Sequence, residues 1–152
     1  MAGTQVAVIG SGAEHVGRAE EVGRLLAERG CTVVTGGLGE VMESAARGAK
    51  SVGGTTIGIL PGESRAAASP WIDHAVVTGV GHARNLAVVA SGDAVIAVGG
   101  KWGTLAEIGF AHVLGRPVVI LDPGWELEGV ERAASPAEAV ELALSRLEGA
   151  GG

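Results

Sequence analysis

A short run of glycines with a lysine, a threonine and a glutamate is the part of this sequence best suited to bind a ligand. It reads Gly99-Gly100-Lys101-Trp102-Gly103-Thr104-Leu105-Ala106-Glu107 and follows an all-apolar segment, residues 94–98. We expect that segment to be a buried strand and the helix after it to begin at Thr104. Backbone N–H groups at a glycine turn and at a helix N-terminus favour anions. The run therefore predicts a site for a phosphorylated small molecule, to which Lys101 would add a positive charge.

The same run has a purely structural interpretation. Thr104 and Glu107 have the spacing of a capping box, in which a threonine caps the helix and a glutamate three residues later bonds back to the cap. Ser135 and Glu138 show that spacing elsewhere in the chain without a glycine turn. The glycines could simply permit positive φ in a tight turn. Three glycines after a strand, with a lysine between them, favour the approach of a ligand instead.

Trp102 is an unusual residue for this run, because the 152-residue chain has only three Trp, one Phe and no Tyr. Its ring could stack on a flat ligand or pack at a contact between subunits, and the sequence leaves both open.

The elements that position this run follow from the alternation of apolar segments with helical patterns. We expect strands at residues 6–9, 31–35, 55–60, 75–78, 94–98 and 118–121. Helical patterns separate most of them, notably over residues 82–91 and 104–114, and the last helix begins at Pro136 after an N-cap serine. Short all-apolar strands between helices are typical of an α/β fold with a doubly wound parallel sheet in three α/β/α layers. We expect one domain over residues 1–148 and a disordered tail at residues 149–152.

Three glycine-rich turns, at residues 10–12, 36–39 and 99–103, follow expected strands. The carboxyl ends of parallel strands share one edge of the sheet, where ligands bind in such folds. Gly10, Ser11, Gly36 and Gly37 therefore become candidate ligand-binding residues beside the run described above.

A dinucleotide cofactor is the first alternative for the turn at residues 10–12. The glycine pattern of such sites would need a third glycine where His15 stands, and an acidic residue where the second strand ends in Thr35-Gly36-Gly37. Two defining features are missing, so we do not expect NAD(P) or FAD. Ser11 and Glu14 can equally be a capping box for the first helix.

Arg84-Asn85, nine residues before Asp93, together with residues 100–107 resembles the LOG family and its wider superfamily, whose members are often mislabelled lysine decarboxylases. The family pattern is P-G-G-x-G-T-x-x-E, preceded by an arginine at the spacing of Arg84. Thr35-Gly36-Gly37-Leu38-Gly39 and Gly115-Arg116-Pro117-Val118 also fit. The resemblance extends from Val6 to about Leu121 and implies a Rossmann-like domain.

Three positions depart from the LOG pattern. Gly99 stands at the family proline, Lys101 at its second glycine, and Asn85 where the cytokinin-activating members usually carry lysine. An Arg-Asn pair is usual in a small branch that includes molybdenum-cofactor carrier proteins. The resemblance therefore implies a carrier of a phosphorylated molecule, with molybdenum cofactor as cargo and no cofactor required for itself.

Two other functions share the same pocket. A LOG-type enzyme would cleave the N-glycosidic bond of a nucleoside 5′-monophosphate, with Glu107 and Arg84 as its catalytic pair by resemblance. A sensor would bind a nucleotide signal without cleaving it. Arg84 could instead be a surface charge on its helix without a role in ligand binding. A pyridoxal-phosphate enzyme would need a marked lysine, and nothing singles out Lys50 or Lys101, so lysine decarboxylation is not expected.

The remaining composition excludes several classes of partner. The net charge is −6 with no basic run, which argues against nucleic acid. His15, His74, His82 and His112 are scattered without metal-ligand spacing, so no metal site is expected. The single Cys31 is expected to be buried. The sequence contains no span of about 18 apolar residues, so no membrane helix is predicted. We expect a cytoplasmic protein. The resemblance further implies a homodimer or homotetramer. The Ala-rich face of the expected helix at residues 82–91 would suit the contact between its subunits.

Overall fold

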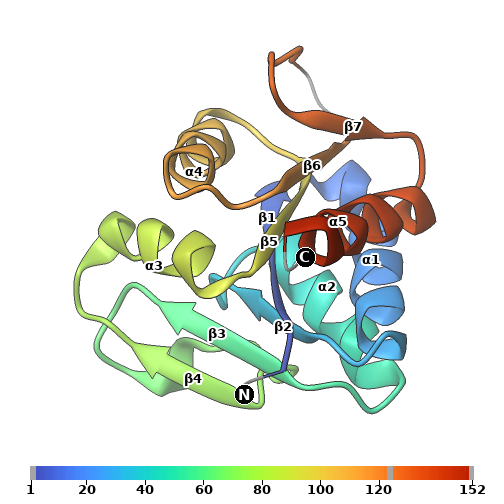
Figure 1. The fold of residues 1–152 in the computed structure, drawn as a ribbon. Coiled ribbons are helices and arrows are strands. Elements are labelled where there is room, and N and C mark those ends of the chain that lie inside the picture. The colour runs from blue at the N-terminus through green and yellow to red at the C-terminus, as the bar shows by residue number, and fades with distance from the viewer. Residues whose placement is uncertain (1–2, 123–124, 151–152) are drawn as a thin grey trace.

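A single parallel sheet organises the chain, with strand order β4-β3-β2-β1-β5-β6-β7 (Figure 1). The computed structural model describes residues 3–122 and 125–150. Its strands are β1 Gln5–Ser11, β2 Thr32–Thr35, β3 Thr56–Leu60, β4 His74–Val77, β5 Ala94–Gly99, β6 Val118–Leu121 and β7 Glu131–Ala133. The chain winds outward from β1 to β4 and then returns to β5 on the other side of β1. The direction of winding therefore reverses between β1 and β5, where α/β sheets bind ligands.

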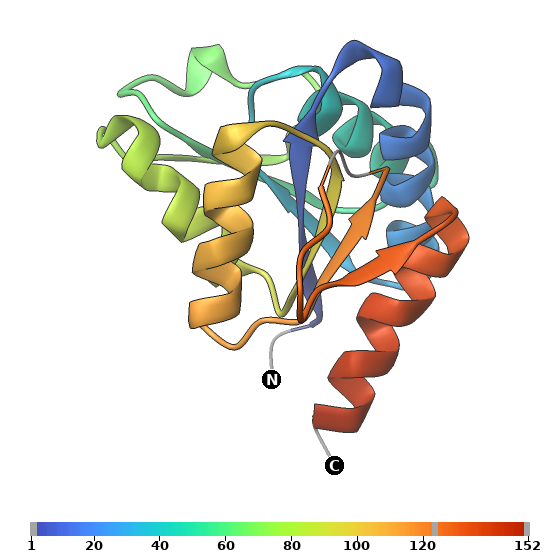
Figure 2. The same ribbon diagram turned by 90° about the horizontal axis from the view of Figure 1, so that it is seen from above.

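Helices cover both faces of this sheet (Figure 2). Helices α1 Val16–Glu28, α2 Glu40–Ser51 and α5 Pro136–Ala150 lie on one face, and α3 Arg84–Ser91 and α4 Trp102–Val113 lie on the other. This arrangement confirms the expected three-layer, doubly wound, Rossmann-like single domain. No helix in the described part of the chain is long and apolar enough to cross a membrane.

The two faces have separate cores, which alternate along the central strand. Val6 and Val8 of β1 pack with α1, α2 and α5, whereas Ala7 and Ile9 pack with α3 and α4. All four side chains are at most 2% exposed. Because β1 is buried on both sides, it contains apolar residues without alternation, the pattern on which the sheet prediction depended.

Most of the expected strands are confirmed to within two residues, but the sequence did not predict β7. Only Ala133 of its three residues is buried, and the other two are charged, so this edge strand has no apolar pattern. Helix α5 extends to Ala150 and so includes the first two residues that we placed in a disordered tail. Residues 151–152 lie outside the described residues.

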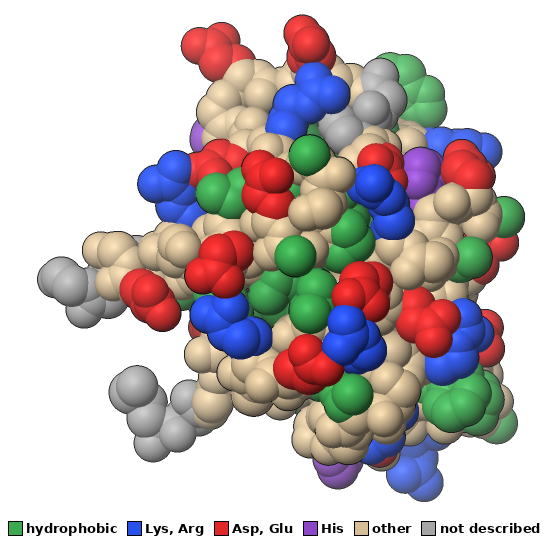
Figure 3. All heavy atoms as spheres, turned by 90° about the vertical axis from the view of Figure 1, so that its right-hand side faces the viewer, with side chains coloured by type: hydrophobic (Ala, Val, Ile, Leu, Met, Phe, Trp, Pro, Cys, Tyr) green, Lys and Arg blue, Asp and Glu red, His purple; other side chains and the backbone are tan. Residues whose placement is uncertain are grey.

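The outer surfaces of the two helical layers differ in chemistry. Acidic and basic side chains alternate over the face formed largely by α1, α2 and α5 (Figure 3), where Arg29 pairs with Glu141 at 2.7 Å. The opposite layer exposes large apolar side chains, among them Leu86 on α3 and Phe110 and Val113 on α4.

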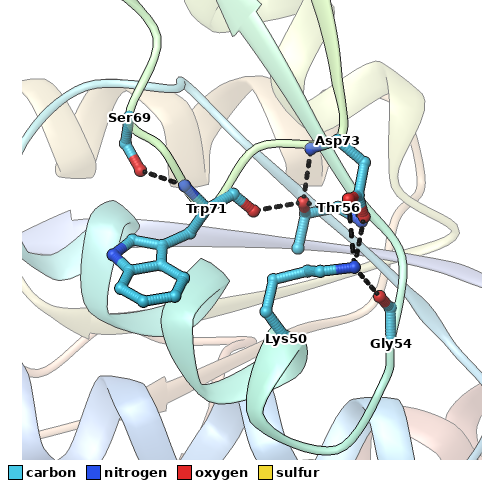
Figure 4. Close-up of polar contacts among 6 residues, drawn as sticks. All are labelled: Lys50, Gly54, Thr56, Ser69, Trp71 and Asp73. Atoms are coloured by element: carbon cyan, nitrogen blue, oxygen red, sulfur yellow. Dashed lines mark hydrogen bonds and ion pairs between the residues drawn. The ribbon is translucent and has the colours of Figure 1, made fainter.

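A polar network fixes the connection between β3 and β4, which contains no α-helix (Figure 4). Lys50, in the last turn of α2, donates to the Gly54 carbonyl at 2.8 Å and to the Asp73 carboxylate at 3.0 Å. Asp73 also accepts from the Thr56 N–H at 2.9 Å, and the Thr56 hydroxyl donates to the Trp71 carbonyl at 2.6 Å. The Lys50 ammonium thus has structural hydrogen-bond partners, unlike the free amine that would form a Schiff base.

We expect Asp73→Ala to lower the free energy of unfolding by about 1–3 kcal/mol, since it leaves the buried Thr56 N–H without its acceptor and removes one of the two acceptors of the partly exposed Lys50 ammonium. Burial raises the pKa of Asp73, but hydrogen bonds from Lys50 and Thr56 outweigh it and lower the pKa below its ordinary value. This contribution is therefore present above the ordinary carboxyl pKa and is lost as the pH falls through the folded-state pKa.

Denaturant unfolding at pH 7 and pH 3 measures this effect. The matched control is Glu126→Ala, which removes a 3.3 Å pair between Arg132 and a carboxylate that is 91% exposed. Equal losses for the two variants at pH 7 would contradict the assignment.

Candidate functional site

A cavity of about 240 Å³ opens at the carboxyl edge of the sheet, where β1 and β5 end. Its walls come from the ends of β1 and β2, from α2, from the start of α3 and from the start of α4. The lining residues are Ile9, Gly10, Ser11, Gly36, Met42, His82, Arg84, Asn85, Lys101, Gly103, Thr104 and Glu107.

Helix α4 begins beside this cavity without a side-chain cap. Its first residue is Trp102 and its N-cap is Lys101, in extended conformation with no capping hydrogen bond. The first helical bond runs from the Leu105 N–H to the Lys101 carbonyl at 3.0 Å. The N–H groups of Trp102, Gly103 and Thr104 therefore have no acceptor within the helix. The first turn carries no acidic residue either, so this end of the helix can accept an anion.

The capping-box interpretation of Thr104 and Glu107 is wrong. The helix begins two residues earlier than expected, which places Thr104 inside its first turn. The Thr104 side chain is 5% exposed and packs beneath Gly100, where an added Cβ would lie 2.5 Å from the Thr104 Cβ. By contrast, Ser135 does cap α5, because its hydroxyl accepts from the Glu138 N–H at 3.1 Å.

The alternative capping box at the start of the first helix is also wrong. Ser11 is the last residue of β1 and lines the cavity. The 3-10 helix Ala13–His15 that follows has Gly12 at its N-cap and no side-chain capping bond. Ser11 therefore does not cap the first helix, and it remains a candidate ligand-binding residue.

Arg84 is anchored rather than a free surface charge. Its Nη1 donates to the Gly36 carbonyl, after β2, and to the Ile59 carbonyl in β3 at 2.7 Å. Its Nε donates to the Asn85 side-chain oxygen at 2.9 Å. The start of α3 is thus tied to the ends of two strands. Burial lowers the pKa of Arg84 from its ordinary value, and the charge of Glu107 opposes that change.

Glu107 is a half-buried carboxyl group that accepts no hydrogen bond from the described residues. Burial raises its pKa to about 7, and the positive charge of Arg84 limits the rise. The two side chains form no direct salt bridge in the described structure. A carboxyl group with this pKa exchanges a proton near neutral pH, so it can donate to or accept from a bound molecule.

The structure brings most of the candidate residues together but not all. Gly37, Gly99, Gly100 and Trp102 do not line the cavity, and Trp102 is 82% exposed. Gly99 and Gly100 shape the turn through positive φ values of 60° and 119°.

Sequence reasoning missed three lining residues: Ile9, Met42 and His82. Each lies within three residues of a signal that was used, namely Gly10, Gly39 and Arg84. Proximity to those signals could have suggested them. No group of three His, Cys, Asp or Glu side chains suited to a metal ion occurs in the described ranges.

Comparison with known proteins places this geometry among related folds. The model of the SLOG cluster4 family matches residues 3–146. The molybdenum cofactor binding protein of Rippkaea orientalis is 36% identical with a TM-score of 0.91, covering 97% of this chain and 99% of that one. The molybdenum cofactor carrier protein of Chlamydomonas reinhardtii is 33% identical with a TM-score of 0.87, over 97% and 99% of the two chains.

An enzyme is also among the relatives. The cytokinin riboside 5′-monophosphate phosphoribohydrolase of Mycobacterium tuberculosis is 34% identical over 128 residues, which are 78% of this chain and 68% of that one. These matches confirm the resemblance seen in the sequence to the LOG superfamily and its molybdenum-cofactor carrier branch.

The close approach of Arg84 to Gly36 gives a test of the electrostatics. A Cβ on Gly36 would lie 2.8 Å from Arg84 Nη1 and 2.9 Å from Cζ, so Gly36→Ala must displace the guanidinium. Because that charge holds the pKa of Glu107 down, we expect Arg84→Met, which removes the charge, to raise this pKa above about 7, and Gly36→Ala, which moves the charge, to shift it. Carboxyl-carbon NMR titration measures it.

The matched control for this titration is Gly109→Ala on α4, where an added Cβ meets nothing within 4 Å. It should leave the pKa of Glu107 unchanged. A native Glu107 that titrates at the ordinary carboxyl pKa would refute the burial assigned to this group.

Proposed function

Because the chain belongs to the SLOG cluster4 family, we propose that it binds a phosphorylated heterocyclic molecule and acts as a carrier of the molybdenum-cofactor type. The observation that carries the proposal is the uncapped first turn of α4, whose N–H groups adjoin a cavity lined by Lys101 and Arg84. Two structural relatives that cover nearly the whole chain are named for binding or carrying molybdenum cofactor.

In this proposal the phosphate lies against the first turn of α4. The N–H groups of Gly103 and Thr104 donate to its oxygens, and the helix dipole and the Lys101 ammonium compensate its charge. Arg84 Nη2 is not hydrogen-bonded to any described residue and supplies a further donor. The cavity of about 240 Å³ holds the phosphate and its neighbouring atoms, and the heterocycle extends through the open side.

A hydrolase is the second candidate, and one observation favours it. Glu107, with a pKa raised to about 7, could transfer a proton during cleavage of an N-glycosidic bond. The curated relative named as a phosphoribohydrolase adds support. Against it, Glu107 is the single carboxylate among the lining residues, and Arg84 Nη1 is committed to backbone carbonyls. A nucleotide sensor shares these features and would bind without turnover.

Two assays on the purified protein separate carrier from hydrolase. Metal analysis and pterin fluorescence detect copurified cargo, and a panel of nucleoside 5′-monophosphates is assayed for free base and ribose 5-phosphate. The carrier proposal predicts molybdenum and pterin in stoichiometric proportion and no base release. Turnover that disappears in Glu107→Gln would contradict the carrier and support the hydrolase.

The proposal includes self-association through the layer of α3 and α4. Leu86, Trp102, Phe110 and Val113 are between 43% and 83% exposed there, in contrast to the charged opposite face. Trp102 does not line the cavity of one chain, which favours a contact between subunits over stacking on the ligand. We place such a homodimer or homotetramer in the cytoplasm, in keeping with the buried, unpaired Cys31.

We expect Lys101→Met and Gly103→Ala each to weaken binding of a nucleoside monophosphate, measured by calorimetry. Loss of a charged hydrogen-bond partner should cost the lysine variant roughly 10- to 100-fold in Kd. An added Cβ on Gly103 meets no protein atom within 4 Å, so any loss comes from occupation of the cavity and not from a damaged fold.

Gly109→Ala, also on α4 with open space around its Cβ, is the control and should bind normally. Unchanged affinity in both cavity variants would place the phosphate elsewhere.

A further inference from the structure

His15 contacts the glycine turn from outside the cavity. It is the last residue of the 3-10 helix Ala13–His15, it does not line the cavity, and its side chain is 19% exposed. A Cβ built on Gly99 would lie 2.2 Å from His15 Cδ2 and 2.6 Å from Nε2. The imidazole therefore fills the space beside the first glycine of the turn.

Two carboxylates lie beside this imidazole, and one of them is itself fixed by an arginine. Asp122 Oδ2 lies 3.6 Å from His15 Nδ1, and Glu14 Oε1 lies 3.4 Å from Nε2. Arg18 Nη1 donates to Asp122 Oδ1 at 3.0 Å and to the Ala134 carbonyl at 3.2 Å, which links β6, α1 and the start of α5. His15 thus packs against Gly99 on one side and lies beside the Asp122 and Glu14 carboxylates on the other.

Asp122 adopts a left-handed backbone conformation beside these contacts. Its φ is +54°, which no other non-glycine residue in the described ranges shares. Aspartate is one of the few residues other than glycine that visit this region as single residues. The hydrogen bond from Arg18 fixes the Asp122 carboxylate on the side of His15.

The turn is consequently clamped on both sides. Gly99 packs against His15, and Gly100 packs against Thr104, whose side chain would lie 2.5 Å from an added Cβ. Thr104 faces the cavity, and His15 does not. Pairing with Ser11 of β1 holds Gly99 in the sheet, so the imidazole controls how the turn continues from Gly99 towards the first turn of α4, where the phosphate is proposed to lie.

We infer that His15, packed against Gly99, is a positioning residue that fixes the turn at residues 99–103 and thereby sets the affinity of the site for phosphate. The inference rests on the proposed function, because it concerns the same site. His15 acts through the backbone of Gly99 and makes no contact with the ligand.

The first test compares two replacements of His15, with inorganic phosphate and adenosine 5′-monophosphate as calorimetric probes. His15→Ala removes the packing on Gly99 and should lower affinity about tenfold, a coupling typical of residues in contact. His15→Phe keeps a flat ring there and should restore affinity to within about threefold of the native value. The melting temperature of each variant is also measured. If His15→Phe restores affinity without a matching change in melting temperature, the effect of His15 is one of positioning and not of general stability.

The second test is a double-mutant cycle between positions 15 and 99. Gly99→Ala in the native chain forces the new Cβ into the imidazole and should weaken binding. In the His15→Ala background the clash with the imidazole is absent, whereas the approach to the Ser11 carbonyl oxygen at 2.8 Å and the positive φ of Gly99 remain, so the same substitution should cost less but still weaken binding. A Gly99→Ala effect of equal size in both backgrounds, or native affinity in His15→Ala, would overturn the inference.

Lys101→Met separates a failure of the positioning role of His15 from a failure of the proposed phosphate site. If Lys101→Met weakens phosphate binding while His15→Ala does not, the positioning role fails and the proposed function stands. If neither Lys101→Met nor His15→Ala alters binding, both fail.

Discussion

The N–H groups of Trp102, Gly103 and Thr104 in the first turn of α4 require acceptors, and the described part of the chain provides none. A helix usually meets this need with a serine, threonine or aspartate at its N-cap, but here Lys101 occupies that position, with an extended backbone and no capping hydrogen bond. The preceding strand β5 is buried along its whole length and fixes where the turn must start. The doubly wound topology then directs these donors to the edge of the sheet where the paired strands β1 and β5 end. The result is a fixed set of donors beside a cavity, which is suited to an anion.

Two ionisable groups complete the cavity in opposite ways. Arg84 is rigid because carbonyls of two neighbouring strands accept from it, so its charge is a fixed part of the wall. Glu107 has no such partner, and burial brings its pKa to about 7, where its charge varies with small changes in environment. A phosphorylated ligand would favour the protonated form of Glu107, because a second negative charge nearby opposes ionisation. Linkage between ligand binding and protonation of Glu107 would suit a carrier that binds its ligand reversibly. The same protonation equilibrium would let Glu107 transfer a proton in a hydrolase.

The fold could be predicted from the sequence where burial leaves an apolar pattern. The all-apolar strands and the glycines that end them located the sheet, its carboxyl edge and most of the cavity. β7 could not be found in this way, because only Ala133 of its three residues is buried. The helix start at Trp102 was missed because Thr104 and Glu107 imitate a capping box, and only the packing of Thr104 beneath Gly100 distinguishes the two. His82 and Met42 lie within three residues of Arg84 and Gly39, so the sequence points to their neighbourhood, but only the tertiary structure shows which side chains of that neighbourhood reach the cavity.

The central claim, that the turn and the first helical residues of α4 hold a phosphate group, can be tested by amide NMR. The isotopically labelled protein is titrated with inorganic phosphate and then with adenosine 5′-monophosphate, and the shift of each backbone N–H is followed. The account predicts that the N–H resonances of Gly103 and Thr104, with their neighbours in residues 99–102, move most with both ligands and by similar amounts. The largest shifts at another surface, with these amides unmoved, would contradict it.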